Sequence, residues 1–206
     1  MEVYADVVCP FTHVGLRRLV AERAARARDD VALVVRAWPL ELVNGAPLDP
    51  AVVAEEVAAL RASVAPDLFA CFDPARFPAT SVPALTLAAV AYESGSAGGE
   101  RVSLAVRAAL FEEGRDITDP GVLAEVGSAA GLDPDTCTPE ALEAATVSVR
   151  AQWEEGVARG VIGSPHFFVG DEDMFCPTLR ISHDEHGFAV ELDREGFDAF
   201  VNRCFA

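Results

Sequence analysis

One cysteine, Cys9, stands where an apolar segment passes directly into a helical pattern, in the stretch MEVYADVVCPFTHVGLRRL. Pro10 suits the first turn of a helix, because no backbone N–H partner is needed there. At a helix N-terminus, unpaired N–H groups and the helix dipole stabilise a thiolate and lower the pKa of the thiol. The pattern therefore predicts an acidic, reachable nucleophile at position 9. The alternative is a buried cysteine that packs as a small apolar residue.

Position 12 is where a second cysteine would complete a C-x-x-C pair, but it holds threonine. Without that thiol, Cys9 cannot release a mixed disulfide by closing a disulfide within the motif. The Thr12 hydroxyl, one turn into the helix, can hydrogen-bond a thiolate at Cys9. Phe11 lies between the two residues and is expected to form an exposed apolar lip for a ligand.

A second candidate segment, GSPHFFV, comes late in the chain and begins a strand pattern. Pro165 cannot donate a hydrogen bond inside a sheet, so it belongs at the first residue of a strand or at an edge. The Ser164–Pro165 bond is a candidate for the cis form, which would turn the Ser164 backbone outward for pairing with a thiol ligand. The alternative is ordinary punctuation of a strand edge. His166 either lines the same cleft or packs beside Phe167.

Two further titratable residues lie close to Cys9 in the sequence. His13 would add positive charge, but its side chain lies about 100° around the helix from Thr12, which favours a partly exposed surface histidine. Asp6, if buried, would either oppose formation of the Cys9 thiolate or accept its proton.

The five cysteines are an odd, widely spread set, which favours free thiols in a reducing compartment over a disulfide framework. Cys71 could replace the missing thiol, whereas Cys176 is expected to point away from the helix start, and structural roles are favoured for both. No His/Cys cluster has the spacing of a zinc site. His183 and His186 lie in the segment SHDEHG, where a solvated turn fits better than a metal site.

Composition limits the class of protein. A chain of 206 residues with 51% hydrophobic residues can form a sizeable core, in one large domain or in a domain with an insertion. The formal net charge of -17 argues against nucleic acid and anionic membranes as partners. No segment reaches the ~18 apolar residues of a membrane span. The N-terminus lacks the pattern of a signal peptide, so we expect a cytoplasmic protein.

The elements that must position Cys9 and Pro165 follow from hydrophobic patterning. Residues 2–8 predict a strand, 10–28 a helix and 31–40 a second strand, and the crossover helix implies that the two strands are parallel. A long helical region follows, in which GSAGG (95–99) separates two of the helices. The helical patterns cover a segment after Asp49 and then about 83–94, 100–113, 119–130 and 138–159. Strand patterns return at 166–170 and in two later segments, before a final helix near the C-terminus.

Four stretches in this order resemble the DsbA-like thioredoxin superfamily: DVVCP, VGLRR, LFEEGRDITDPGVL and GSPHFFV. The sequence is most similar to the FrnE-like branch, which neighbours the 2-hydroxychromene-2-carboxylate isomerases, and the resemblance covers about residues 1–170. It implies an α/β thioredoxin fold (βαβ…ββα) with an inserted all-helical subdomain. Residues 1–42 and 160–206 would form the thioredoxin-like domain, and residues 43–159 the insertion.

The same resemblance implies roles for the candidate residues. Cys9 matches the nucleophilic cysteine, Pro165 matches the cis-proline that faces it, and Thr12 stands in the place of the resolving cysteine. Ser164 would contact a bound thiol or peptide through its backbone. The expected substrate-binding surface consists of Pro10, Phe11, Ser164, Pro165 and His166. No metal and no permanently bound cofactor are expected, and a low-molecular-weight thiol such as glutathione is the candidate exchange partner.

Three functions are compatible with these residues. The prediction is a thiol–disulfide oxidoreductase that works through Cys9 alone and is resolved by an external thiol, with a small-molecule or protein thiol or disulfide as substrate. A glutathione-dependent isomerase or transferase is the second, although a cysteine that holds a cofactor thiolate risks forming a disulfide with it. The third is a non-catalytic protein that binds a partner across the edge between Cys9 and Pro165. The oligomeric state does not follow from the sequence.

Overall fold

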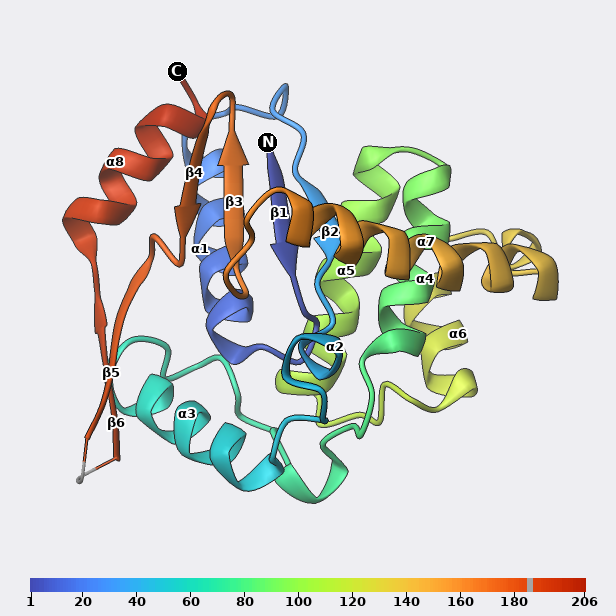
Figure 1. The fold of residues 1–206 in the computed structure, drawn as a ribbon, viewed down its shortest axis with the longest axis horizontal. Helices are drawn as coiled ribbons and strands as arrows, with labels where there is room; N and C mark the ends of the chain where they lie inside the picture. The colour runs from blue at the N-terminus through green and yellow to red at the C-terminus, as the bar shows by residue number, and fades with distance from the viewer. Residues whose placement is uncertain (185–186) are drawn as a thin grey trace.

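A four-stranded mixed sheet lies at the centre of the computed structural model, which describes residues 1–184 and 187–206 (Figure 1). The strand order is β2-β1-β3-β4, with β1 and β2 parallel and with β3 antiparallel to both β1 and β4. The four strands are β1 (Glu2–Ala5), β2 (Val34–Ala37), β3 (His166–Val169) and β4 (Glu172–Phe175). The mixed sheet and the helices around it confirm the predicted thioredoxin-like α/β fold with a helical insertion.

The first βαβ unit forms as predicted, but both of its strands are shorter. Helix α1 (Pro10–Ala25) begins at the predicted proline, with Cys9 as its N-cap residue. Strand β1 ends at Ala5, because the next residues bond to a side chain: the Asp6 carboxylate accepts hydrogen bonds from the N–H groups of Val8 and Leu40. Strand β2 is followed by a short helix that the sequence did not predict, α2 (Leu40–Asn44).

The helical region contains five long helices whose caps follow from the sequence. Three of them begin with a side chain that accepts a hydrogen bond from the first turn, at Asp49, Asp119 and Thr138. The helices are α3 (Pro50–Ser63), α4 (Val82–Glu93), α5 (Ser96–Phe111), α6 (Pro120–Ala129) and α7 (Pro139–Ala158), with short 3-10 turns at Pro74–Arg76 and Pro134–Thr136.

The predicted break at residues 95–99 is wrong, because helix α5 already begins at Ser96. Only Gly95, with φ 121°, breaks the helical path. Gly99 is needed inside the helix for another reason: a Cβ atom there would lie 2.2 Å from the ring of Tyr92 on α4. Gly99 therefore permits the close packing of α4 against α5.

The two faces of the sheet carry different helices. Val3, Ala5 and Phe167 pack on the face that α1 and α8 (Arg194–Cys204) cover. Tyr4 and Phe168 point to the other face, which α7 crosses in Figure 1.

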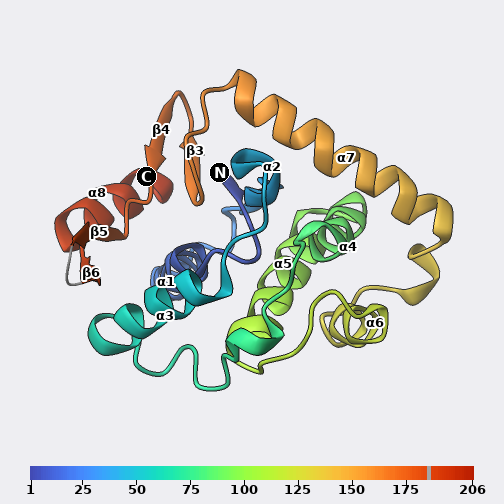
Figure 2. The same cartoon turned by 60° about the horizontal axis from the view of Figure 1, so that its bottom comes forward.

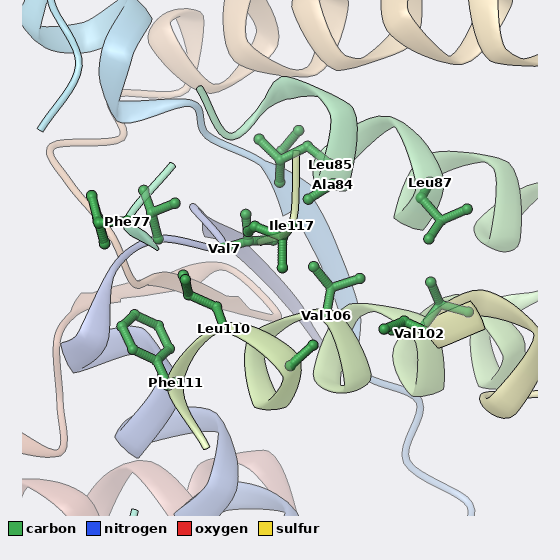
Figure 3. Close-up of a cluster of buried hydrophobic side chains, with 14 of the residues drawn as sticks. Val7, Phe77, Ala84, Leu85, Leu87, Val102, Val106, Leu110, Phe111 and Ile117 are labelled. Atoms are coloured by element: carbon green, nitrogen blue, oxygen red, sulfur yellow. The ribbon is translucent and has the colours of Figure 1, made fainter. Parts of the chain in front are cut away.

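The largest buried cluster joins the α1 end of the sheet to the helical region (Figure 3). Val7, two residues before Cys9, packs there with residues of α4 and α5 such as Leu85, Val106 and Leu110. The helical region thus continues the core of the sheet, and the boundaries at residues 43 and 159 stay a prediction.

The C-terminal segment adds a hairpin that lies outside the main sheet. Strands β5 (Leu179–Asp184) and β6 (Gly187–Leu192) pair with each other in a separate two-stranded sheet, and β6 lies against α3 (Figure 2). The ring of His183 lies 4.5 Å from that of Phe188 in this hairpin, whereas His186 falls outside the described residues. Within residues 1–184 and 187–206, no three His, Cys, Asp or Glu side chains group as ligands for a metal ion. No helix in that part of the chain has the length and apolarity to cross a membrane.

Candidate active site at the start of α1

The Cys9 thiol faces the loop that carries Pro165. Its sulfur donates a hydrogen bond of 3.2 Å to the carbonyl oxygen of Ser164, and the Ser164–Pro165 peptide bond is cis. Two parts of the chain 155 residues apart therefore meet at this sulfur.

The environment of the Cys9 thiol differs from the prediction of an exposed, acidic group. Cys9 is only 4% exposed, and its side chain makes no capping hydrogen bond to the first turn of α1. Burial has the largest influence and raises the pKa of the Cys9 thiol, although contacts with Thr12 act in the opposite direction. The resting protein thus carries a protonated, covered thiol, because the loop at Ser164 and the helical region close over the helix start.

Thr12 and Ser164 form a buried pair of hydroxyls beside Cys9. Their oxygens lie 2.7 Å apart, and the Ser164 hydroxyl also accepts a 2.9 Å hydrogen bond from the backbone N–H of Asp6. Ser164 therefore contributes its side chain as well as its backbone. Its carbonyl points at Cys9 and not outward as expected, so a ligand has to displace the thiol before it can pair with that carbonyl.

The remaining predicted binding residues lie in different surroundings. Pro10 is buried at the first helical position, and Phe11 is half-buried against the main cluster instead of forming an exposed lip. His166 stacks on Phe168, with ring centres 5.1 Å apart, on the sheet face opposite α1. Its Nε2 lies 3.0 Å from an Asp173 carboxylate oxygen. His166 thus takes the packed position and not the cleft position.

A buried pair of opposite charges, Asp6 and Arg107, lies beneath the helix start. Asp6 is fully buried, and burial raises the pKa of its carboxyl to about 6. Arg107, also fully buried, reaches in from α5 and donates a 3.2 Å hydrogen bond to the backbone carbonyl of Asp6. Burial lowers the pKa of Arg107 to about 10. Arg107 was not identified from the sequence. Its position between Val106 and Leu110, two buried apolar residues of α5, could have indicated a buried arginine.

A second missed residue, Glu56 of α3, lies within electrostatic range of Cys9. It is half-buried, and it follows Val53 and precedes Val57, two buried residues of the same helix. Burial raises the pKa of the Glu56 carboxyl to about 7, and its negative charge contributes to raising the pKa of the Cys9 thiol. Helix α3 thus brings to the site a carboxylate that opposes thiolate formation.

Replacing Glu56 by glutamine is expected to speed alkylation of Cys9 at pH 8. The variant lacks the negative charge, and a single charge at this range changes thiolate formation by roughly three- to tenfold. The difference from the wild type should vanish near pH 6, where Glu56 is already protonated, since its pKa is about 7. Glu55→Gln, at an exposed position on the same helix, is the matched control. Equal rates for both variants at pH 8 would refute the assignment.

His13 is buried, and the prediction of a surface histidine is wrong. The side chain is 1% exposed, and its ring lies 5.6 Å from that of Phe69 and 5.2 Å from that of Phe111. The sequence pattern of α1 could not show that a turn of the helical region covers this side. Nε2 lies 3.0 Å from a Glu112 carboxylate oxygen without forming a hydrogen bond. Burial, helped by the charges of Arg107 and Arg17, lowers the pKa of His13 to about 3.

The five cysteines are all free thiols. Cys71 is exposed, and its backbone carbonyl lies close to Gly114. Cys176 is buried beside Pro165, to whose carbonyl its backbone N–H donates a 2.9 Å hydrogen bond. Cys176 also belongs to the buried cluster that contains Val8 and Val14, so the expectation that it points away from the helix start is wrong. Cys71 as a resolving thiol stays a prediction.

A cavity in the helical region lies outside the candidate site. Its volume is about 650 Å³, and it lies between α4, α6 and α7. Apolar residues such as Leu87, Leu123 and Leu142 line it. Cys9 is not among the residues that line this cavity, so the cavity is separate from the candidate site.

A family model described as the DSBA-like thioredoxin domain matches residues 1–183. The chain belongs to this family. The resemblance inferred from the sequence is thus confirmed. No curated protein matches the chain.

Solved structures show the same fold at low sequence identity. A Nitrosomonas europaea protein, provisionally named a protein disulfide isomerase, superimposes with a TM-score of 0.67 at 14% identity, over 98% of this chain and 97% of that one. The cytosolic disulfide reductase DsbM from Pseudomonas aeruginosa gives 0.59 at 19% identity, over 98% and 96%. DsbM has also been solved with glutathione. A 2-hydroxychromene-2-carboxylate isomerase gives 0.60 at 20% identity, over 84% and 87%.

Proposed function

We propose that the protein is a thiol–disulfide oxidoreductase in which Cys9 attacks a disulfide and an external low-molecular-weight thiol supplies the electrons. One observation carries the proposal: the Cys9 sulfur lies 3.2 Å from the Ser164 carbonyl, beside cis-Pro165, at the N-terminus of α1. A disulfide substrate that displaces the thiol from this carbonyl would place its own sulfur against Cys9. The glutathione complex of DsbM supports a small thiol as the electron donor.

The proposed reaction has two exchange steps. The Cys9 thiolate attacks a substrate disulfide R–S–S–R, forms the mixed disulfide Cys9–S–S–R and releases RS⁻, which takes up a proton. An external thiolate R′S⁻ then attacks the mixed disulfide, and Cys9 leaves as the thiolate. A second R′SH completes the reduction, so that two R′SH and one R–S–S–R give two RSH and one R′–S–S–R′.

The Cys9 thiol is buried in the free protein and must lose its proton before it can attack. Since burial raises the pKa of the Cys9 thiol, the free protein holds little thiolate at neutral pH. Substrate binding breaks the hydrogen bond to Ser164, and Thr12 is placed to stabilise the thiolate that forms. Reactivity is therefore proposed to depend on the bound substrate. Free thiols at all five cysteines fit a reducing compartment, and we propose the cytoplasm, where DsbM acts by its name.

The test is the reduction of 2-hydroxyethyl disulfide by glutathione, followed as the formation of glutathione disulfide. The wild type should accelerate the reaction, and Cys9→Ser should return it to the uncatalysed rate. Cys137→Ser, which removes a half-exposed thiol of the helical region, should leave the rate unchanged.

Two other results would each overturn the proposal. An uncatalysed rate for the wild type, together with tight non-covalent binding of glutathione, would instead support an isomerase or transferase. An uncatalysed rate without glutathione binding would support a non-catalytic binding protein.

A further inference from the structure

Cys176 lies directly across from Pro165 in the sheet. His166 of β3 is paired with Phe175 of β4, and the next pair toward the helix start is Pro165 with Cys176, joined by the 2.9 Å hydrogen bond between them. Cys9 holds the preceding carbonyl, that of Ser164. The Cys9 sulfur and the Cys176 backbone N–H thus donate to the adjacent carbonyls of Ser164 and Pro165.

The side chain of Cys176 lies on the face of the sheet that α1 covers. His166 and Phe175 pack against each other on the opposite face. The ring of Pro165 lies 3.9 Å from the position of a Cβ at Gly15 on α1, and Cys176 belongs to the same buried cluster as Val8 and Val14. The residues flanking Cys9 therefore share one core with Cys176.

The backbone at Cys176 is held in an unusual conformation. Its φ is 45°, in the left-handed region that residues other than glycine rarely adopt. Such outliers concentrate at functional sites, where the surrounding structure maintains them. Cys176 is also within electrostatic range of Cys9, because the charge of Cys9 adds to the effect of burial in raising the pKa of the Cys176 thiol to about 12.

We propose that Cys176 is an internal resolving thiol for Cys9 and takes the role that Thr12 cannot perform. This inference rests on the proposed function, since it needs Cys9 to form a mixed disulfide first. The Cys176 thiolate attacks the Cys9 sulfur of Cys9–S–S–R, a Cys9–Cys176 disulfide forms, and RS⁻ leaves and takes up the proton that Cys176 lost. Two external R′SH then reduce this disulfide and become R′–S–S–R′, so the overall reaction is unchanged.

The burial of Cys176 determines when its attack on the mixed disulfide competes with attack by an external thiol. A thiol with a raised pKa attacks slowly at neutral pH, so abundant external thiol reaches the mixed disulfide first. When external thiol is scarce, the internal attack has time to occur. In the mixed disulfide, Cys9 can no longer ionise, so it no longer contributes to raising the pKa of the Cys176 thiol. Closure of the disulfide needs the two Cα atoms within about 7 Å of each other.

The experiment uses the reduced full-length protein, freed of reductant and treated with one equivalent of glutathione disulfide. After the remaining thiols are blocked, intact mass and non-reducing peptide maps identify the products. The wild type should lose two hydrogens and give a linked peptide pair containing Cys9 and Cys176. Cys176→Ser and Cys176→Ala should instead stop at a glutathione adduct on Cys9.

Cys204→Ser is the matched control and should behave as the wild type. Cys204 is as buried as Cys176, and burial raises the pKa of its thiol likewise to about 12, but it belongs to the other core cluster. Cys71→Ser should also behave as the wild type.

The possible failures are distinguishable. An adduct on Cys9 that persists in the wild type as it does in Cys176→Ser overturns the inference and leaves the proposed function standing. A linked pair containing Cys71 overturns it in favour of Cys71. No adduct or linked peptide at Cys9 in any variant overturns the proposed function itself. The wild-type peptide map decides the matter even if the Cys176 variants fail to fold.

Discussion

Replacing Thr12 by cysteine is expected to make a disulfide between positions 9 and 12 the main oxidised form of the protein. Cys9 and Thr12 both contact Ser164, one through its carbonyl and the other through its hydroxyl, so a thiol at position 12 starts close to the Cys9 sulfur. An attack from the next turn of α1 replaces the attack by an external thiol and the slow attack by the buried Cys176 thiol, whose pKa is about 12. The lifetime of a mixed disulfide at Cys9 should therefore fall by on the order of a hundredfold at low external thiol.

The measurement is the decay of a glutathione adduct on Cys9 after excess thiol is removed, followed by quenched mass spectrometry. Thr12→Ser is the matched control, because it keeps the hydroxyl beside Ser164 and adds no thiol. Losing the bond to Ser164 should cost the cysteine variant about 1 kcal/mol of stability, which a denaturant titration can detect. An adduct that decays equally in both variants would contradict the placement of Thr12 as the missing resolving position.

Acid is expected to destabilise the protein through His13. The folded pKa is about 3 and lies below the ordinary value of 6.5, so the unfolded chain binds a proton that the folded chain refuses. The stability that His13 contributes is present above about pH 6.5 and is lost as pH falls toward 3. Between pH 7.5 and pH 4.5 the loss amounts to about 3 kcal/mol.

His13→Phe isolates this effect. Phenylalanine keeps an aromatic ring between Phe69 and Phe111, and neither ring nitrogen of His13 has a hydrogen-bond partner to lose. Urea titrations at pH 7.5 and pH 4.5 give the free energy of unfolding of both proteins. Between these two pH values, the variant should lose about 3 kcal/mol less than the wild type. Asp6, whose raised pKa makes stability fall as pH rises from about 4 to about 6, is present in both proteins and cancels in the difference. Parallel pH profiles would show that His13 is protonated in the folded protein.

Local sequence signals predicted the parts of the site that single segments determine. Cys9 and Pro10 define the start of α1, and Pro165 defines the start of β3, because caps and proline restraints act within a few residues. That the two segments face each other was implied by the resemblance to the DsbA-like family and not by a local signal.

The features that were missed or wrong depend on contacts between distant segments. Burial of Cys9 and His13 comes from the covering loop and the helical region, which no pattern within α1 records. Arg107 and Glu56 act on Cys9 from helices whose packing direction the sequence did not predict. Cys176 was misplaced because strand β4 had no clear boundaries in the sequence, so its register against β3 was not available.

The pairing of the first strand with one near the end of the chain affects how the protein is made. Strand β1 pairs with β3, and Cys9 finds its carbonyl only when residue 164 has been synthesised, 155 residues later. At ordinary ribosomal speeds this interval lasts roughly 10–30 s. Throughout it the nascent chain presents an uncovered thiol to the oxidants and thiols around it. The nascent chain is therefore open to modification at Cys9, a thiol that is buried once the protein has folded.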